Sequence, residues 1–277
     1  MDLALKDRTV FITGASGGIG RALVIAFAQE GASVAAHAYR GGAKLRAWLA
    51  EQPFQDRVLA VEADIRDPVT LRKAFAEAAR RFDRVEICVA NAGSRPEEAA
   101  GLRSAGVDRI RTTIEANLLG AIWTAKAFLE QIDGSEEGAA LLFIGSTAAS
   151  FGEQGFADYA AAKSGLTGLV RTLKNEIVRV DPKGRVNLLE PGWTRTHVPR
   201  PALQDLEAIR RVVRTMPLRQ LARAEDVART ALWLCSPVAG RHITGQTITV
   251  AGGMEGRLLW EPDEIDPAAI RRAAGLQ

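Results

Sequence analysis

The chain has 277 residues, of which 47% are hydrophobic and 25% are charged, and its formal net charge is +3. These values are close to the averages of globular proteins, so they exclude a disordered chain and a fibrous repeat. The arginines are spread over segments with helical periodicity instead of forming one basic stripe, which argues against a nucleic-acid partner.

Short apolar runs recur along the chain and predict seven β-strands. They cover residues 9–13, 33–38, 58–62, 85–90, 139–144, 185–190 and 247–250. Segments with helical periodicity lie between them, among them residues 19–29, 69–81, 107–131, 157–180 and 225–235. Because strands and helices alternate and the strands are apolar on both faces, we expect a Rossmann-type α/β fold, a doubly wound, mostly parallel seven-stranded sheet with helices on both faces.

No linker and no internal repeat interrupts this pattern before about Gly253, so we expect one domain over residues 1–253 and an extension over 254–277. Cys88 lies in an apolar strand run and Cys235 ends a helical one, as expected of buried thiols in a reducing compartment. The first seven residues do not resemble a signal peptide, and no apolar run is long enough to span a bilayer. We therefore expect a cytoplasmic protein with no membrane partner.

A glycine-rich turn, Thr-Gly-Ala-Ser-Gly-Gly-Ile-Gly, occupies residues 13–20, between the first strand and the first helix. Small residues let the backbone approach a ligand closely, and a helix N-terminus offers free N–H groups and partial positive charge. The turn therefore suits the pyrophosphate of a dinucleotide, although a merely tight strand-to-helix connection has a similar composition. The candidate cofactor-binding residues here are Gly14, Ser16, Gly17, Gly18, Ile19 and Gly20.

Tyr159 and Lys163 lie four residues apart in a segment that is predicted to be helical. About one helical turn separates them, so both side chains project from one face. An ammonium about 4 Å from a phenol, at an effective dielectric near 20, stabilises the phenolate by roughly 4 kcal/mol, which lowers the phenol pKa by about three units. Such a pair suits proton transfer near neutral pH.

Other motifs accompany this pair. They are the glycine turn, Asn91-Ala92-Gly93, Asn117, Ser146 thirteen residues before Tyr159, and Pro191-Gly192 followed by Thr196. Together they resemble the short-chain dehydrogenase/reductase family over residues 5 to about 253, in its compact single-domain branch, with similarity to 3-oxoacyl-[acyl-carrier-protein] reductases. The resemblance implies an NAD(P)-dependent oxidoreductase that transfers a hydride between nicotinamide and a carbonyl or secondary alcohol.

The resemblance also implies four catalytic roles. Tyr159 is expected to be the general acid or base, Lys163 to lower its pKa and hold the nicotinamide ribose, and Ser146 to hydrogen-bond the substrate oxygen. Asn117 is expected to anchor a water that leads protons outward. Each of the last three has a structural alternative: Ser146 as a helix cap, Asn117 as a helix-interior residue bonded to a carbonyl, and Lys163 as a surface charge.

Further positions match cofactor contacts of the family. These are Asn91, Ala92 and Gly93 against the glycine turn, Asp64 and Ile65 beside the adenine, Tyr159 and Lys163 near the ribose, and Pro191, Gly192, Thr194 and Thr196 around the nicotinamide. The copy departs from the family at Ala90, which stands where Asn is common and lacks its hydrogen-bonding side chain.

The second strand runs into Tyr39 and Arg40, which are further candidate cofactor-binding residues, and it carries no carboxylate at its end. NAD enzymes of this fold usually place Asp or Glu there to bind the ribose hydroxyls, whereas an arginine pairs with a 2′-phosphate. We therefore favour NADP(H). NAD(H) stays the alternative, because Gly17 stands where many NADP-using relatives carry a second basic residue. His37 is interpreted as a strand-end residue with satisfied hydrogen bonds, or as a phosphate contact.

The candidate substrate residues are Ser146, Phe151, Gln154, Tyr159 and Trp193, a mixture that names no particular substrate. Residues 193–217 correspond to a variable segment over the substrate in relatives. This segment contains Pro199, Pro201 and an amphipathic stretch, and it is either a movable lid or a plain helical insertion.

The extension carries Leu258, Leu259 and Trp260, which are too apolar to lie idle in water, so we expect it to pack on the body or on a neighbouring subunit. The resemblance implies a homotetramer or homodimer, and our hypothesis is that the extension contributes to a subunit contact. Ala251 replaces a usual Asp of the family, which removes a structural hydrogen bond and leaves the chemistry untouched.

The expected partner is a small carbonyl or alcohol substrate, with no metal. A ketone or 3-oxoacyl reductase is the main interpretation, and an NAD-dependent sugar or polyol dehydrogenase is the first alternative. A non-catalytic NAD(P)-binding regulator is the second, which the joint presence of Ser146, Tyr159, Lys163 and Asn117 disfavours.

Overall fold

The structure is a computed structural model that describes residues 2–132, 138–197 and 203–276. At its centre lies a seven-stranded sheet in which every neighbouring pair is parallel. Its strand order is β3 (Val58–Glu62), β2 (Ser33–Ala38), β1 (Thr9–Ile12), β4 (Ile87–Ala90), β5 (Ala140–Ile144), β6 (Arg185–Pro191) and β9 (Thr247–Val250). All seven predicted strands are present, and the predicted doubly wound α/β fold is confirmed.

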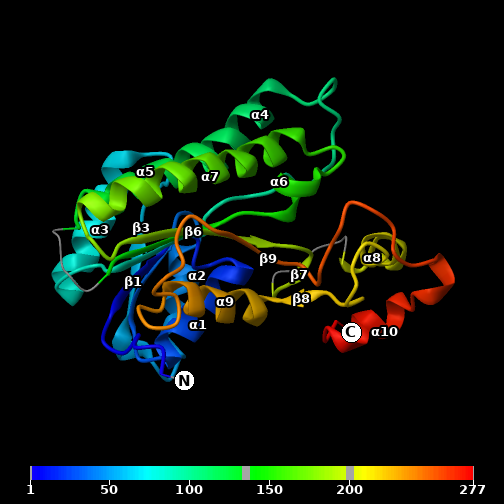
Figure 1. The fold of residues 1–277 in the computed structure, drawn as a ribbon. Helices are drawn as coiled ribbons and strands as arrows, with labels where there is room; N and C mark the ends of the chain where they lie inside the picture. Colours follow the sequence, from blue (N-terminus) through cyan, green and yellow to red (C-terminus); the bar gives the residue numbers. More distant parts are fainter. Residues whose placement is uncertain (1, 133–137, 198–202, 277) are drawn as a thin grey trace.

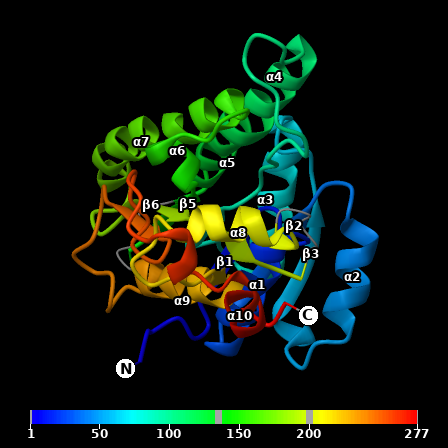
Figure 2. The same cartoon turned by 90° about the vertical axis from the view of Figure 1, so that its right-hand side faces the viewer.

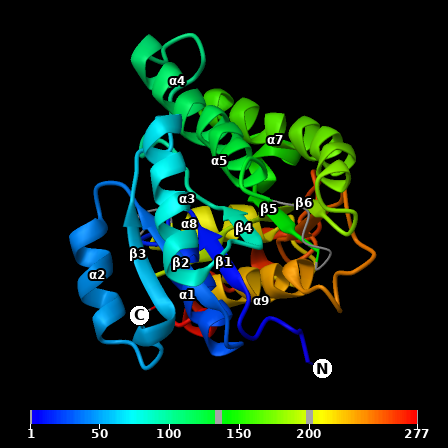
Figure 3. The ribbon, with the colours of Figure 1, turned by 90° about the vertical axis from the view of Figure 1, so that its left-hand side faces the viewer.

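Helices cover both faces of the sheet (Figures 1 and 3). One face carries α1 (Gly18–Gln29), α2 (Gly42–Ala50) and α9 (Ala224–Cys235). The other carries α3 (Pro68–Phe82), α5 (Gly120–Leu129) and α7 (Ala157–Glu176). Because each strand is covered on both sides, its residues are apolar without alternation, as the sequence indicated.

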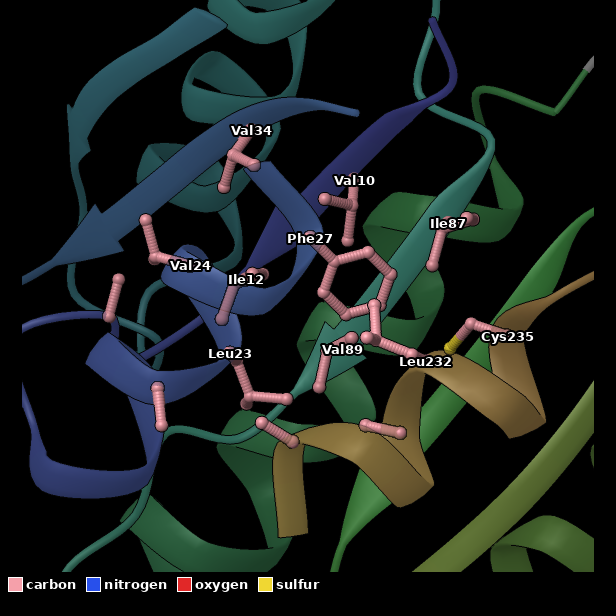
Figure 4. Packing of buried hydrophobic residues seen from close by; sticks show 14 of the residues in the cluster. Val10, Ile12, Leu23, Val24, Phe27, Val34, Ile87, Val89, Leu232 and Cys235 are labelled. Atoms are coloured by element: carbon pink, nitrogen blue, oxygen red, sulfur yellow. The ribbon is translucent and has the colours of Figure 1, made fainter. Parts of the chain in front are cut away.

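Successive residues of β1 fill two separate cores, because strand side chains alternate between the faces. Val10 and Ile12 pack under α1 and α9, where Phe27 and Leu232 meet them (Figure 4). Phe11 points to the opposite face and belongs to the core under α3, α5 and α7. Removing a large side chain such as Phe27 from water contributes roughly 2 kcal/mol or more to folding.

One predicted helix is interrupted. The periodicity of residues 107–131 predicts a single helix, but the structure has α4 (Val107–Ile114), a π-helical turn (Glu115–Leu119) and α5. Within this turn the Nδ2 of Asn117 donates to the carbonyl oxygens of Thr113, at 3.0 Å, and Ser94, at 2.8 Å. A polar side chain that bonds the backbone competes with the regular helix, and such widened turns are frequent at functional sites.

Other elements differ from the prediction because their patterns are short. Helix α7 ends at Glu176 and continues as a 3₁₀ turn, Ile177–Arg179, within the predicted 157–180. Sequence periodicity did not reveal α2, α6 (Thr147–Phe151) or the two-residue strands β7 (Thr194–Arg195) and β8 (Ala222–Arg223).

Strands β1 and β4 are neighbours at the middle of the sheet, where the strand order changes direction. The chain leaves β1 toward one edge and β4 toward the other, so the loops after the two strands diverge. Ligands of such sheets bind in the crevice outside the carboxyl ends at this point. The glycine turn follows β1 and the Asn91 segment follows β4, so both motifs border this crevice.

Two helices lie beyond the carboxyl end of the sheet, α8 (Leu206–Val213) and α10 (Pro267–Ala273) (Figure 1). Figure 2 shows them side by side, although 53 residues separate the end of one from the start of the other by number, 213 to 267. Among the described residues, no helix is long and apolar enough to cross a membrane.

Arg185, the first residue of β6, caps the C-terminus of α9 from within the core. Its side chain is buried, and its Nη1 donates to the carbonyl oxygens of Leu234 and Gly240, the latter at 3.0 Å. Its Nη2 donates to the carbonyl oxygen of Cys235 at 3.0 Å. The last carbonyl groups of a helix have no N–H donor within the helix. The guanidinium of Arg185 supplies hydrogen-bond donors to two of them.

We predict that Arg185→Met lowers the free energy of unfolding by about 3 kcal/mol, because three buried carbonyls lose a charged donor. Urea unfolding followed by circular dichroism measures the change. Arg229→Met is the matched control: its side chain is 75% exposed, so a change within about 0.5 kcal/mol is expected. Equal effects of the two substitutions would contradict the capping role.

Candidate active site

The glycine turn between β1 and α1 is built for a close approach. Gly14 has a φ of +67°, and a Cβ there would lie 2.8 Å from the Cα of Ala92. A Cβ at Gly18 would overlap the side chain of Thr196. Gly17 caps α1 without any side-chain hydrogen bond, and the first turn of α1 has no acidic residue. The N-terminal N–H groups of α1 therefore face a small concave turn that fits an anion such as a pyrophosphate.

Thr13 holds the Asn91 segment against this turn. Its Oγ1 accepts from the backbone N–H groups of Asn91 and Ala92, both at 2.9 Å. The Nδ2 of Asn91 in turn donates to the carbonyl oxygens of Thr13, at 2.8 Å, and Gly14, at 3.2 Å. Two motifs separated by 78 residues are thus joined at the crevice. Sequence reasoning placed Thr13 in the turn but gave it no role in the site.

The His37 side chain is hydrogen-bonded to the glycine turn. Its Nδ1 accepts from the backbone N–H of Gly14 at 3.3 Å, and its Nε2 lies 2.9 Å from the carbonyl oxygen of Ala63, so the ring is neutral with its proton on Nε2. Burial lowers the pKa of His37, which keeps this neutral form. Of the two interpretations of His37, the satisfied strand-end residue is the one that the geometry supports.

The end of β2 gathers positive charge around one ring. The guanidinium of Arg40 lies 5.3 Å from the ring centroid of Tyr39, and that of Arg66 lies 5.7 Å from it. Arg66 also binds Asp64 through both carboxylate oxygens, with the shortest contact at 2.6 Å, and this hydrogen bonding lowers the pKa of Asp64. Sequence reasoning missed Arg66, although its position two residues after Asp64 was a usable signal.

Three other predicted positions are placed by packing. Ile65 is buried and a Cβ at Gly120 would lie 2.7 Å from its Cδ1. Pro191 ends β6 and is buried, and Gly192 lies so close to Ala251 that a Cβ on the glycine would be 2.7 Å from that methyl group. The small Ala251 in place of Asp therefore has a packing partner at this point.

The segment after Gly192 turns back toward the glycine turn. The Oγ1 of Thr194 donates to the carbonyl oxygen of Gly192 at 2.9 Å, and Thr196 lies against Gly18. Residues 191–196 and the glycine turn thus enclose the crevice from opposite sides. The remaining turn residues, Ser16 and Ile19, are half-buried beside it.

Asn117 and Lys163 converge on the backbone of Gly93. A Cβ on Gly93 would overlap the Oδ1 of Asn117 and would lie 3.3 Å from the Nζ of Lys163. The Oδ1 of Asn117 is buried and accepts no hydrogen bond from the protein. A buried acceptor without a partner costs about 1–3 kcal/mol, unless a water or ligand supplies the donor. The structural alternative for Asn117, a hydrogen bond to a backbone carbonyl, holds for its Nδ2. Its Oδ1 remains available to accept from a water or a ligand.

Lys163 is not a surface charge. Its side chain is buried, and its Nζ donates to the carbonyl oxygen of Ile144 at 2.9 Å. Burial lowers the pKa of Lys163 to about 8. Its Nζ lies 5.9 Å from the ring centroid of Tyr159, so both side chains project from one face of α7 as predicted.

Two contacts hold the start of α7, where Tyr159 lies. The carboxylate of Asp158 accepts from the backbone N–H of Tyr159 at 3.0 Å and pairs with Arg109 at 3.1 Å. Ser146 caps α6, since its Oγ accepts from the backbone N–H of Ala148 at 3.2 Å. The cap alternative for Ser146 is therefore correct for one lone pair, and its hydroxyl proton is left to donate elsewhere.

The candidate substrate residues are more open than the catalytic ones. Phe151 is 45% exposed and Gln154 is exposed, while Trp193 is half-buried. A cavity of about 720 Å³ lies between α9 and α10, but none of the predicted site residues lines it. Among the described residues, no group of three or more His, Cys, Asp or Glu side chains could hold a metal ion.

Comparison with known proteins identifies this arrangement. A family model described as Enoyl-(Acyl carrier protein) reductase matches residues 14–255. The chain belongs to the short-chain dehydrogenase/reductase family. As a member of this family it is an NAD(P)-dependent oxidoreductase that acts between a carbonyl and a secondary alcohol.

Several relatives in the family cover nearly the whole chain. An L-rhamnose 1-dehydrogenase (NAD(P)(+)) of Sphingomonas sp. is 31% identical over 90% of this chain and 97% of its own. A 3-oxoacyl-[acyl-carrier-protein] reductase of Escherichia coli is 29% identical over 90% and 98%. The solved structure of a glucose/ribitol dehydrogenase of Brucella melitensis has a TM-score of 0.79 at 28% identity, covering 92% of this chain and 99% of that one.

The buried ammonium leads to a prediction about stability. Because the pKa of Lys163 is lower in the folded chain, about 8 against 10.5, protonation favours the unfolded state. The cost is full below pH 8, at about 3 kcal/mol, and it disappears as the pH rises through 10.5. Lys163→Met is therefore expected to raise the free energy of unfolding at pH 7 by about 2 kcal/mol, after the lost hydrogen bond to Ile144 is subtracted.

Urea unfolding at pH 7 and at pH 10 measures this effect, and the difference between the two proteins should shrink at the higher pH. Lys126→Met, whose side chain is 54% exposed, should show no such pH dependence. A Lys163→Met protein no more stable than the wild type at pH 7 would contradict the burial cost.

Proposed function

We propose that Tyr159 transfers the proton in a carbonyl reduction or alcohol oxidation at this site, and that a ketone or 3-oxoacyl compound is the substrate. The observation that carries the proposal is the buried ammonium of Lys163, which shares one face of α7 with the Tyr159 ring. An ammonium in a low-dielectric site stabilises a phenolate far more than it would in water, so a phenol there can exchange a proton near neutral pH.

The other side chains have complementary tasks in this proposal. A bound nicotinamide supplies or accepts the hydride. The Oγ of Ser146 accepts from the backbone N–H of Ala148, so its hydroxyl proton is left to donate to the substrate oxygen. Tyr159 gives its proton to the same oxygen during reduction. The unpaired Oδ1 of Asn117 accepts from a water that returns a proton toward Lys163 and Tyr159.

The cofactor has a cradle in the glycine turn and the segments that flank it. The uncapped N-terminus of α1 would bind the pyrophosphate, and the close contact between Gly18 and Thr196 would be opened by it. Asp64 and Ile65 would flank the adenine, and Asn91, Ala92 and Gly93 would lie along its ribose. Residues 191–196 would cover the nicotinamide.

NADP(H) is the proposed cofactor of choice. Two guanidinium groups lie around the Tyr39 ring, that of Arg40 from the loop after β2 and that of Arg66 from the loop after β3. Arginine pairs with a phosphate through two parallel hydrogen bonds, whereas the ribose hydroxyls of NAD call for a carboxylate. The carboxylate of Asp64 is already bound by Arg66, so it is not available for that task.

A sugar or polyol dehydrogenase is the second candidate. The observation that favours it is a polar rim: Arg95 and Glu153 form an ion pair at 2.6 Å in the loops that flank α6 and follow Gly93, next to the exposed Gln154. Carboxylate, guanidinium and amide groups bind several hydroxyls at once. The similarity to L-rhamnose 1-dehydrogenases of two organisms points the same way.

The proposed location is the cytoplasm, and the proposed assembly is a homotetramer or homodimer. Cys88 and Cys235 are both buried and unpaired, as in proteins kept in a reducing compartment. Strand β9 forms an edge of the sheet and its outer residues Thr247 and Thr249 are exposed, which leaves a backbone edge that a second copy could cover.

Tyr159→Phe is expected to lower turnover by at least about a thousandfold, because the phenol that gives its proton to the substrate oxygen is lost. Absorbance of the reduced nicotinamide, with acetoacetyl-CoA for reduction and L-rhamnose for oxidation, measures turnover, and fluorescence of bound NADPH measures cofactor affinity. Cofactor affinity should change by less than about threefold.

The other tyrosine of the chain lies at the proposed cofactor site, so Tyr39→Phe can change the KM for NADPH but should keep its turnover at saturating NADPH. Retained turnover in Tyr159→Phe would refute the assigned role. The substrate that the wild type consumes distinguishes the two candidate functions.

Arg40→Ala is expected to raise the KM for NADPH by about tenfold or more, because a bidentate pair with phosphate is lost, and to leave the KM for NADH nearly unchanged. Steady-state rates with each cofactor measure this split. Arg46→Ala is the matched control, since Arg46 is exposed at the same edge but pairs with Glu62 at 2.6 Å. Equal changes for both cofactors would contradict the proposed 2′-phosphate contact.

A further inference from the structure

We propose that Trp260, in the C-terminal extension, is a positioning residue of the substrate site: it fixes the α8 segment, here residues 203–221, and with it the wall that carries Trp193. The proposal rests on the proposed function only in taking Trp193 and Phe151 as substrate-lining residues. The contacts themselves lie within one chain, between residues that are far apart in sequence.

The backbone of the extension is hydrogen-bonded to the end of the α8 segment at two points. The N–H of Glu255 donates to the carbonyl oxygen of Thr215 at 2.9 Å, and the N–H of Leu259 donates to that of Arg214 at 2.7 Å. The extension therefore does not trail away from the body after Gly253. It runs back along the residues that follow α8.

Trp260 is the anchor of this contact. Its indole Nε1 donates to the carbonyl oxygen of Met216 at 2.8 Å, and its own carbonyl oxygen accepts from the Nε of Arg214 at 2.7 Å. The guanidinium of Arg219 lies over its ring, 4.3 Å from the centroid. The Trp260 side chain thus makes a hydrogen bond and a cation–π contact to the same short segment, and its half-buried ring packs there. A residue with several such contacts contributes much of the energy of an interface.

A separate apolar cluster joins the extension to the substrate side. Its buried members are Leu203, Ile209, Val213, Met216 and Leu221 of the α8 segment, with Ile265 and Ala274 of the extension. Trp193, Met254 and Trp260 pack against this cluster. Since Trp193 directly follows Gly192, the cluster links the extension to the segment that closes the crevice.

The extension also adjoins the other candidate substrate residue. A Cβ on Gly256 would lie 4.0 Å from the Cδ1 of Phe151. Helix α10 packs against α8, and the Nη2 of Arg223 donates to the carbonyl oxygen of Ala273 at 2.7 Å. The extension therefore lies beside Trp193 on one side and Phe151 on the other.

These contacts agree with one of the two expectations for the apolar tail, since Trp260 packs on its own body. The subunit contact stays a hypothesis. Leu258, two residues earlier, is 60% exposed, so the anchoring is specific to Trp260 and not a property of the whole apolar run.

Limited proteolysis tests the positioning role without any need for activity. The α8 segment carries Arg210, Arg211 and Arg214, after which trypsin cleaves. In Trp260→Ala we expect cleavage at these three sites, followed by mass spectrometry, to speed up by about tenfold or more, because local opening controls the rate. Leu258→Ala is the matched control and should be cleaved like the wild type.

Kinetics tests the link to the substrate site. Trp260→Ala should raise the KM for acetoacetyl-CoA or L-rhamnose, whichever the wild type consumes, by about fivefold or more, with cofactor affinity unchanged. Trp260→Phe keeps the ring and loses the N–H, so it should fall between the wild type and Trp260→Ala in both measurements.

Unchanged cleavage of the α8 segment in Trp260→Ala would overturn the proposal, even if light scattering then showed a change of mass that assigned Trp260 to a subunit contact. Faster cleavage with an unchanged substrate KM would overturn the link to the substrate site. If the wild type consumes neither compound, the proposed substrates are wrong, and the proteolysis still decides whether Trp260 holds the α8 segment. Unchanged NADPH binding shows that Trp260→Ala has kept its fold.

Discussion

The proposed active site depends on one buried ammonium. Lys163 lies inside the protein at the end of β5, held by the carbonyl oxygen of Ile144, and desolvation lowers its pKa to about 8. Keeping a cation there costs stability, so the fold supplies a compact polar surrounding for it. That surrounding consists of the Tyr159 ring on the same helix face and the Gly93 backbone, with the Asn117 amide beside Gly93.

The position of this ammonium follows from the sheet topology. Parallel strands bring all their carboxyl ends to one edge, so the loops after β1, β4, β5 and β6 meet although they are far apart in sequence. Thr13 and Asn91 show how closely they meet, with hydrogen bonds across 78 residues. Gly14 and Gly93 lack a Cβ where one would strike Ala92 or Asn117, so two glycines make the approach possible.

Beyond the sheet edge, the C-terminal extension packs on the α8 segment, beside the proposed substrate site. The α8 segment is too short to bury its apolar side chains alone, and the extension covers them with Ile265, Trp260 and α10. In our proposal, stability and substrate recognition are coupled at this end of the molecule, because the cluster that buries the extension also packs Trp193. The proposed catalytic pair on α7 takes no part in this cluster.

Much of this protein is readable from its sequence, for a local reason. The seven strands, the glycine turn and the one-turn spacing of Tyr159 and Lys163 are short-range patterns that the backbone geometry of strands and helices translates directly into structure. The π-helical turn around Asn117 was not readable from the sequence. It accompanies a hydrogen bond from the Asn117 side chain to the carbonyl oxygen of Ser94, which belongs to another loop. The same holds for the hydrogen bond from Gly14 to His37 and for Trp260 on the α8 segment. Arg66 was missed although its position two residues after Asp64 was a usable signal. Sequence alone determined the fold class, the family motifs and which residues are the candidates for the chemistry. Only the tertiary structure decided what surrounds those residues, since burial and long-range hydrogen bonds exist only after distant segments have packed.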